Sequence, residues 1–338
     1  MRAFIVTAPR EAGVYEVDAP VAALGGVVVD VERVGVCGTD VDFYTGEMQY
    51  LHDGHAHYPM RLGHEWSGIV RAVGDGVDET WLQQRVMGDT MLGCGKCRRC
   101  LNSLQHVCEF RFEVGVRNGF AGALAEQIAV PVSSLHSLPP AVDAALGALV
   151  EPGGNALRAV WGADLTDGDR VLILGPGTIG LLCAYFARSQ GAEVQLMGRS
   201  ASSLNFARSL GFDGCWTSED LPDVPFDAVI DASNDAALPA RALDLVEPGK
   251  RLVFIGIAGT PSLIDTRIQV LNDVTSVGIL SGSPGLAATI DRYASGAVDP
   301  RPLIAMTTGL DGVAGILAGE RAPDAGPGPK FHVDPRLS

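Results

Sequence analysis

The chain has 338 residues, 47% of them hydrophobic and 19% charged, and its formal net charge is −15. This length exceeds what a single hydrophobic core usually organises, so two domains are expected. The acidic balance argues against nucleic acid or an anionic membrane as the main partner, because both require a basic surface, and no apolar run is long enough to span a bilayer.

Short apolar runs separated by Gly, Pro and Asp fill the first part of the chain, up to about residue 152. They predict a β-rich domain with long functional loops. The expected elements are strands at Val27–Val31, Trp66–Val73 and Leu124–Val130, and helices at Asp143–Val150 and Gly154–Trp161 that bracket a Glu151-Pro-Gly-Gly turn.

After residue 169, apolar strands alternate with helices, which is typical of a parallel, doubly wound sheet. The sequence therefore predicts an α/β protein with a β-rich domain at 1–153, a doubly wound domain at 154–285, and a return of 286–338 to the first domain. The expected elements of the second domain are strands Val171–Leu174, Glu193–Met197, Ala228–Ile230 and Leu252–Ile255, with helices Ile179–Ser189, Leu204–Leu210 and Leu238–Val246; a further helix is expected at Leu286–Ala294.

Four cysteines are crowded into one short stretch, Cys94-Gly-Lys-Cys97-Arg-Arg-Cys100 and then Cys108. Four thiolates at this spacing can surround one zinc ion. Disulfides are the competing interpretation. Because the chain shows no secretory leader pattern, we expect a cytoplasmic protein with reduced, metal-binding thiols. Such a site has no open position for a substrate, so zinc chemistry would require a second site.

A glycine-rich segment, Gly175-Pro-Gly177-Thr178-Ile179-Gly180, follows one of the apolar strands and opens a helix. In this context the glycines permit a tight turn and let backbone N–H groups approach the pyrophosphate of a dinucleotide. An ordinary glycine turn is the alternative, but the strand before it and the helix after it favour dinucleotide binding.

The residues after the next strand, Gly198-Arg199-Ser200, bear on the choice of dinucleotide. An NAD site usually carries an acid here that accepts a hydrogen bond from the ribose 2′-hydroxyl. Gly198 takes that place, while Arg199 and Ser200 suit a 2′-phosphate. We therefore expect NADP(H) in preference to NAD(H). The alternative is that Arg199 stacks on the adenine of NAD.

Cys37, His64 and Glu151 are candidates for the second metal site. Thiolate, imidazole and carboxylate are good zinc ligands, and three of them leave a fourth position open. Taken singly, each has an ordinary explanation: a small buried cysteine, a loop histidine and a solvated acid at a helix end.

Taken together, the motifs resemble the zinc-dependent medium-chain dehydrogenase/reductase (alcohol dehydrogenase) superfamily over essentially the whole chain. The resemblance implies a GroES-like catalytic domain, a Rossmann cofactor domain, two zinc ions per chain, and a homodimer or homotetramer. The Glu-Pro pair is closest to the polyol, sorbitol, threonine and glucose dehydrogenase branch. The motifs that carry the resemblance are Cys37-Gly-Thr39-Asp40, Gly63-His64-Glu65, the four-cysteine stretch, Glu151-Pro152 and the glycine-rich segment.

The same resemblance implies roles for individual residues. Cys37 and His64 would bind a catalytic zinc, Glu151 would bind it directly or through water, and Glu65 would be a metal-site acid that can become a ligand. Thr39 would relay the proton of the alcohol, although a turn hydroxyl bonded to its own backbone is the alternative.

Other polar residues have less certain positions. Many members of the superfamily carry a histidine where Asp42 stands, so a relay through that imidazole is in doubt. The histidines of the loop His52-Asp-Gly-His55-Ala-His57 can bind metal, shuttle protons or contact a polar substrate, or the loop can be a solvated lid. Asp42, His57 and Glu113 are candidate pocket groups. Ser233 follows one strand and Ile255 ends another, at the edge where the nicotinamide end is expected, although plain turns explain them nearly as well.

The sequence thus predicts an oxidoreductase that transfers a hydride between NADP(H) and a secondary alcohol or ketone, with a polyol, sugar or cyclitol as substrate. The alternatives are an NAD-linked alcohol dehydrogenase, a non-catalytic NADPH-binding or redox-sensing protein of the same fold, and a zinc-free enone reductase. The last generally lacks both the cysteine stretch and the Gly-His-Glu ligands. Two zinc ions per chain would favour the enzyme over the binding protein.

Overall fold

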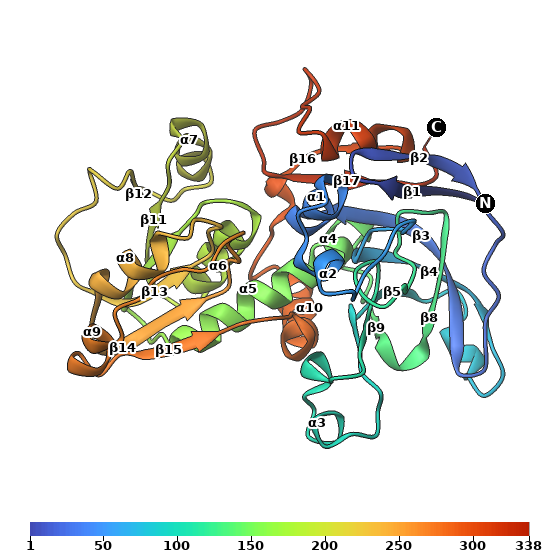
Figure 1. The fold of residues 1–338 in the computed structure, drawn as a ribbon, viewed down its shortest axis with the longest axis horizontal. Helices are drawn as coiled ribbons and strands as arrows, with labels where there is room; N and C mark the ends of the chain where they lie inside the picture. The colour runs from blue at the N-terminus through green and yellow to red at the C-terminus, as the bar shows by residue number, and fades with distance from the viewer. Residues whose placement is uncertain (338) are drawn as a thin grey trace. The chain divides into compact units, whose positions relative to one another are not determined.

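A computed structural model describes residues 1–337 of the chain (Figure 1). The chain divides into two compact units. Unit 1 comprises Met1–Glu151, Leu286–Gly326 and the residues from Lys330 onward, and unit 2 comprises Pro152–Gly285 and Pro327–Pro329. Within the described residues, every helix is too short or too polar to cross a membrane.

Unit 1 is built on a seven-stranded, mainly antiparallel sheet, in which six strands have the order β16-β17-β3-β4-β5-β9 and the seventh, β8, pairs with β3. Its central strand, β3, is rich in valine, which packs well on a pleated surface, and six of its valines are buried. One half of β3 pairs with β8 and the other half with β17. The strands are β1 Arg2–Ala8, β2 Glu11–Glu16, β3 Gly26–Val36, β4 Glu65–Val73, β5 Arg85–Gly88, β6 Met91–Leu92, β7 Phe112–Glu113, β8 Gln127–Pro131, β9 Leu135–Ser137, β16 Ile304–Thr308 and β17 Lys330–Val333; the α-helices are α1 Gly38–Thr45, α2 Gln49–His52, α3 Arg98–Leu101, α4 Ala144–Ala148, α10 Leu286–Ala294 and α11 Val313–Leu317.

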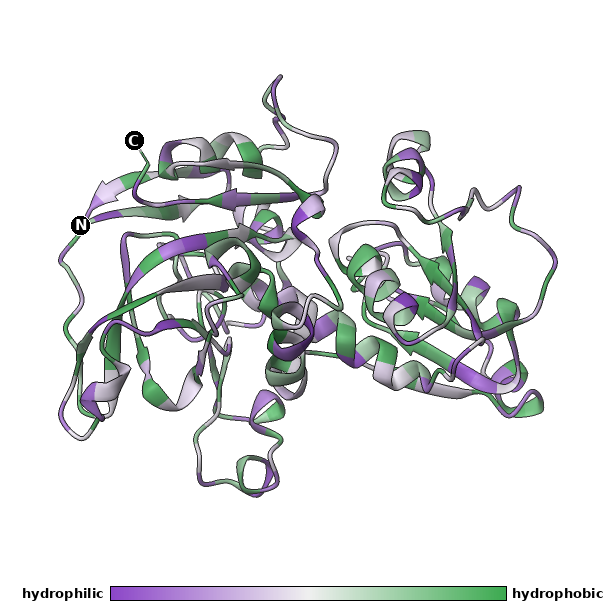
Figure 2. Ribbon diagram, turned by 180° about the vertical axis from the view of Figure 1, so that it is seen from behind, coloured by the Kyte–Doolittle hydropathy of each residue, from purple (hydrophilic) through white to green (hydrophobic). Residues whose placement is uncertain are grey.

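Unit 2 is a six-stranded parallel sheet with the order β12-β11-β10-β13-β14-β15. The side chains of β10 from Val171 to Leu174 are all buried, as expected for a strand covered on both faces. Figure 2 shows apolar residues along the strands of this sheet. The chain order reverses at β10, and the crevice at the carboxyl ends of the strands there is where such sheets bind nucleotides. The elements are α5 Val150–Ala163, which begins at the end of unit 1, β10 Arg170–Leu174, α6 Thr178–Ser189, β11 Glu193–Met197, α7 Ala201–Ser209, β12 Gly214–Trp216, β13 Phe226–Asp231, α8 Leu238–Leu245, β14 Val246–Phe254, α9 Thr266–Leu271 and β15 Thr275–Gly278.

Two local expectations were wrong. Glu151 does not lie in a turn, because α5 already includes it; Pro152 is tolerated there because the first helical turn has no intrahelical partners for its N–H groups. The strand expected from Leu124 begins only at Gln127, since the backbone of Leu124 instead bonds to Phe4 and Leu62.

Candidate functional site

The cysteine lobe (residues 94–108) brings its four thiols together. The Sγ–Sγ distances are 3.9 Å for Cys94–Cys100, 3.6 Å for Cys97–Cys100 and 3.7 Å for Cys97–Cys108. Zinc–sulfur bonds of about 2.3 Å place the sulfurs of a tetrahedral site about 3.8 Å apart. A disulfide would require about 2.05 Å, and all four cysteines are free. The donor set therefore fits one structural zinc ion, and the disulfide alternative does not apply.

Backbone donors favour the thiolate form that zinc requires. The N–H of Cys94 donates to Cys108 Sγ and that of Cys100 donates to Cys97 Sγ, each at 3.5 Å. Hydrogen bonds from the backbone of Lys96 and Cys97 lower the pKa of the Cys94 thiol to about 6. The backbone hydrogen bond from Cys100 also lowers the pKa of Cys97, whereas burial raises the pKa of Cys100 to about 12, so two of the four thiols are prepared to release their protons to a metal.

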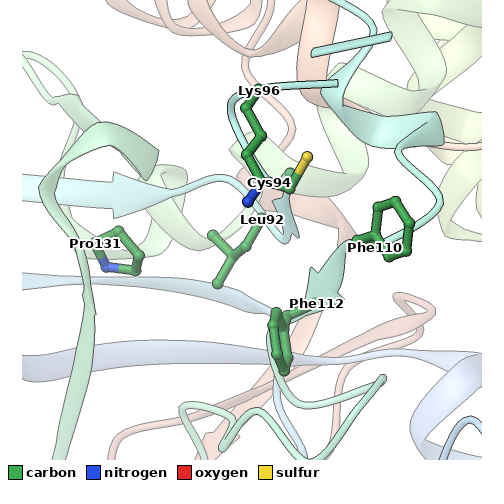
Figure 3. Close-up of a pocket in the computed structure, with 7 residues that line it drawn as sticks. Leu92, Cys94, Lys96, Phe110, Phe112 and Pro131 are labelled. Atoms are coloured by element: carbon green, nitrogen blue, oxygen red, sulfur yellow. The ribbon is translucent and has the colours of Figure 1, made fainter. Parts of the chain in front are cut away.

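The lobe buries little apolar surface of its own. Figure 1 shows the segment around α3 extending away from the rest of unit 1. Leu101 within the lobe is 72% exposed, and Phe110, just after the lobe, is 65% exposed. At its base, a cavity of about 510 Å³ opens between Leu92, Phe110 and Phe112 (Figure 3). A segment with so small a core needs its metal in order to keep one conformation.

A second set of ligand atoms belongs to Cys37, His64 and Glu65, and all lie within 4.8 Å of one another. The pairing of β3 with β4 produces this arrangement, because Gly35 stands opposite Glu65. Cys37 follows the end of β3 and His64 precedes the start of β4. A thiolate, an imidazole and a carboxylate fit a catalytic zinc that keeps a position open for substrate.

Helix α1, which the sequence analysis did not identify, begins directly after Cys37 and supplies Asp40. Asp40 is fully buried; its Oδ2 accepts a 2.8 Å hydrogen bond from Cys37 N, and its Oδ1 lies 3.6 Å from Nδ1 of His64. Burial raises the pKa of Asp40. Burial lowers the pKa of His64, but Asp40, Cys37 and Glu151 outweigh it and hold that pKa well above its usual value. The carboxylate of Asp40 thus places a negative charge beside Nδ1 of His64, at a distance too long for a hydrogen bond.

Lys330, like Asp40, is a residue beside the metal ligands to which the sequence analysis assigned no role. It lies on β17, and its Nζ donates to both carboxylate oxygens of Glu65, at 2.7 and 2.9 Å, and to Val36 O at 3.0 Å. Glu65 is therefore held by a buried counterion beside the other two ligands. Lys330 is one of only three lysines in the chain, and a lysine among the apolar residues of a strand was a signal that could have been used.

The other residues that the sequence proposed for this site differ in their distance from the group of Cys37, His64 and Glu65. Glu151 is outside the group of three, although its charge acts on His64. Thr39 lies in the first turn of α1, next to Cys37. The ring of His55 contacts Arg117 at 3.2 Å, and none of the three loop histidines joins either metal-ligating group among residues 1–337.

Glu113 and its hydrogen-bond partners precede a turn of the chain that contacts the Gly63-His64-Glu65 motif. Glu113 accepts hydrogen bonds from Tyr50 (3.2 Å) and Arg111 (2.7 Å). The turn that follows packs on the backbone beside His64, since a Cβ added to Gly115 would lie 2.9 Å from Gly63 O. Glu113 therefore lies near the metal motif, whereas Asp42 is only half-buried, with a pKa raised by burial.

In unit 2, the glycine-rich segment lies at the carboxyl end of β10. Gly175 has a φ of 91° that favours glycine, and its α carbon faces the backbone of Ser233 after β13. A Cβ on Gly180 would lie 2.0 Å from Gly175 O, whereas one on Gly177 would meet open space. Gly177 is followed directly by α6, beginning with Thr178 and Ile179. This is the geometry that admits a pyrophosphate at a helix N-terminus.

The residues expected at the two ends of the nucleotide lie along the same edge of the parallel sheet, at the carboxyl ends of its strands. Ser233 donates to Asp231 Oδ1 at 2.7 Å, and the N–H of Ile255 donates to Asp231 O at 3.0 Å. Arg199 is 83% exposed at its side chain and lies 3.5 Å from Asp235. Ser200 caps α7 by accepting from Ser203 N.

Gly198 has a packing reason to be glycine. A Cβ at this position would lie 2.7 Å from the ring of Pro176 and 3.2 Å from Leu204. The close approach excludes a side chain whether the ribose carries a hydroxyl or a phosphate. Gly198 alone therefore carries less weight for NADP than the sequence suggested.

Comparison with known proteins gives matches to two family models, the alcohol dehydrogenase GroES-like domain over residues 24–140 and the zinc-binding dehydrogenase over 178–295. The chain is 31% identical to a 2-dehydro-3-deoxy-L-galactonate 5-dehydrogenase of Pseudoalteromonas atlantica over 87% of both chains. It is 30% identical to an L-threonine 3-dehydrogenase of Rhizobium etli, covering 81% of this chain and 82% of that one.

Solved structures are similar over nearly the whole chain. An alcohol dehydrogenase from Escherichia coli CFT073, complexed with NADH, gives a TM-score of 0.90 at 25% identity, and 99% of each chain is covered. A zinc-binding dehydrogenase from Sinorhizobium meliloti 1021, bound to NADP, gives 0.88 at 26% identity with the same coverage. Both dinucleotides therefore occur among similar folds.

Proposed function

Because the chain belongs to the family of zinc-dependent medium-chain alcohol dehydrogenases, we propose that it transfers a hydride between NADP(H) and a secondary alcohol of a polyol, sugar or cyclitol. Family membership makes it a zinc-dependent, NAD(P)-linked alcohol or polyol dehydrogenase. The observation that carries the proposal is the convergence of Cys37, His64 and Glu65 in a chain whose second unit carries a dinucleotide crevice. In this proposal unit 1 is catalytic and unit 2 binds the cofactor.

In the proposed reaction, the residues of unit 1 would have separate roles in metal binding and proton transfer. Bound zinc would act as a Lewis acid towards the oxygen of the alcohol. Cys37 and His64 would hold the metal, and Glu65 or Glu151 would complete its ligand set. Asp40 would keep a negative charge beside the ring of His64, and the hydroxyl of Thr39 would take the proton of the alcohol towards solvent.

Two features support a polyhydroxylated substrate. Tyr50, Arg111 and Glu113 form a hydrogen-bonded cluster beside the metal motif, and such groups can pair with several hydroxyls. The relatives act on a sugar acid and on a hydroxy amino acid, as their names state. A substrate screen should therefore contain neutral polyols, sugar acids and L-threonine.

NADP(H) preference is supported by Arg199 and by the serines at the start of α7. Arg199 is exposed and its pairing with Asp235 is loose, so its guanidinium is free to meet a 2′-phosphate. Ser200 Oγ lies 3.2 Å from Ser202 Oγ and 2.8 Å from Ser203 Oγ, which places hydroxyl donors together at the N-terminus of the helix.

The test is a kinetic screen of zinc-loaded protein with NADP⁺ and NAD⁺. Arg199→Gln should raise KM for NADP⁺ by roughly tenfold or more and leave KM for NAD⁺ unchanged, because only the phosphate loses a charged partner. Arg267→Gln, which changes another exposed arginine paired with an aspartate, is the matched control. Equal effects of Arg199→Gln on both cofactors would refute NADP preference. A homodimer or homotetramer is also proposed, and light scattering would test it.

A further inference from the structure

A separate cavity in unit 1 combines apolar walls with one unpaired cation. Its volume is about 250 Å³, and it lies between the N-terminal hairpin, the segment 56–61 and the segment 116–121. Small-molecule sites usually start at about 300 Å³, so the occupant must be small. The wall includes Ile5, Val17, Met60 and Phe120 as apolar groups, with His57 and Arg61 as the titratable ones.

Arg61 has no acidic partner among residues 1–337. Three other buried or half-buried cations of unit 1 each have one: Arg33 pairs with Asp334, Arg111 with Glu113 and Lys330 with Glu65. The Nε of Arg61 is buried without a hydrogen-bond partner. Burial lowers the pKa of Arg61 to about 10, so the guanidinium is still cationic at neutral pH.

An uncompensated cation in a half-buried position costs free energy, which an incoming anion would recover. No carboxylate lines this cavity, although the chain as a whole is strongly acidic. A planar guanidinium matches a carboxylate with two parallel hydrogen bonds, and the apolar walls would favour a hydrocarbon body over a hydrated dianion.

We propose that this cavity is a binding site for a small monocarboxylate with an apolar body, whose carboxylate pairs with Arg61. The site is distinct from the metal centre, whose ligands are absent from its wall. Its occupant would also stabilise the segment that presents His64, because Arg61 O accepts from Gly122 N at 2.8 Å only three residues before it.

Calorimetric titration of zinc-loaded protein with sodium hexanoate, and with hexanamide as its neutral counterpart, tests the site. Hexanoate should bind roughly 10- to 100-fold more tightly than hexanamide, as expected for a charge-assisted pair, and should raise the thermal midpoint. Arg61→Met should remove that advantage, and should also raise the midpoint of the unliganded protein by removing an unpaired charge. Arg71→Met, at an exposed arginine paired with Asp30, is the control that should change neither property.

Two further variants separate the possible outcomes. Cys37→Ser should leave hexanoate binding intact; binding lost there but kept in Arg61→Met would place the carboxylate at the metal and overturn the proposal. Val17→Phe should weaken hexanoate more than acetate, because it narrows the apolar part of the cavity, and it keeps the test usable if Arg61→Met does not fold. Equal affinity for hexanoate and hexanamide would also overturn the proposal.

Discussion

Glu65 and Lys330 form an ion pair almost wholly removed from water, since their side chains are 1% and 3% exposed. The pair lies beside the thiol of Cys37 and the imidazole of His64 at the metal site. Burial lowers the pKa of Lys330, but Glu65 outweighs it and the net shift is upward, so the lysine stays charged. Removing one member of such a pair leaves a buried charge without compensation. This lowers the free energy of unfolding more than replacing both members by apolar residues does.

We expect Lys330→Met to lower the free energy of unfolding by about 3–5 kcal/mol, and the double variant Lys330→Met with Glu65→Leu to recover much of that loss. Urea denaturation of the purified protein measures both. Lys250→Met is the matched control: its partner Asp227 is also 2.7 Å away, but the pair is partly exposed and should contribute less than about 1 kcal/mol. Similar losses for the two lysine variants would show that Glu65 does not depend on its counterion.

His332, on the same strand, is buried with neither ring nitrogen hydrogen-bonded. Burial, and then the charges of Lys330 and Arg33, lower its pKa to about 3. The folded pKa lies below the unfolded value of about 6.5, so below that pH the unfolded chain binds a proton that the folded chain does not. The contribution to stability is complete above pH 6.5 and is lost as the pH falls.

For the wild type we expect the His332 contribution to fall by about 2 kcal/mol between pH 6.5 and pH 5, at about 1.4 kcal/mol per pH unit. His332→Leu should lack that component, so the difference in urea midpoint between the two proteins should grow with acidity. His57→Leu, at an exposed histidine, should follow the wild type. Parallel pH profiles for wild type and His332→Leu would contradict the assignment.

At the scale of elements, three adjacent strands assemble the metal centre. β4 pairs with one side of β3 and β17 with the other, so Glu65 and Lys330 meet across the end of β3. Gly35, on β3, must be glycine, because a Cβ there would lie 2.1 Å from Oε2 of Glu65. The register of these strands therefore decides which residues reach the metal.

This register explains what the sequence could and could not predict. The four-cysteine stretch is a local motif that its spacing identified, and alternation of strands and helices identified the parallel sheet. Cys37 and His64 became candidate ligands only through the resemblance that the combined motifs carry. Lys330 contacts a residue 265 positions away, and only the pairing of β17 with β3 reveals it. Helix α1 was missed because it has eight residues and little apolar periodicity, and its start depends on the Asp40–Cys37 cap.

The turn after β10 offers two glycines with opposite constraints. A Cβ on Gly180 would collide with Gly175 O, whereas Gly177 has an allowed φ of −87° and no atoms within 4 Å of an added Cβ. Gly177→Ala should therefore leave the thermal midpoint unchanged but raise KM for the dinucleotide at least roughly tenfold, because the methyl group occupies the path of the pyrophosphate. Gly180→Ala should lower the midpoint itself. Unchanged dinucleotide kinetics in Gly177→Ala would place the cofactor elsewhere.

At the scale of the whole molecule, the chain holds two zinc sites with separate tasks. The cysteine lobe offers four sulfurs and no open position, and the exposure of Leu101 in the lobe and of Phe110 just after it indicates that metal substitutes for a core. Cys37 and His64 flank strands β3 and β4, which contribute to the buried core of unit 1. One ion therefore serves structure and the other serves chemistry.

Replacing one ligand at each site should separate these tasks. Cys97→Ser and Cys37→Ser should each lower the zinc content from two ions per chain to one, measured by elemental analysis. Cys97→Ser should lower the thermal midpoint first, because the lobe loses its organising ion. Cys37→Ser should keep the midpoint and lose more than roughly a thousandfold in NADP⁺-linked turnover, because it changes a group at the reacting atoms. Cys183→Ala, at a buried cysteine outside both groups, should retain two ions.

A stable but inactive Cys97→Ser beside an unstable Cys37→Ser would reverse the assignment, since the thiol cluster would then support the chemistry and Cys37 the fold.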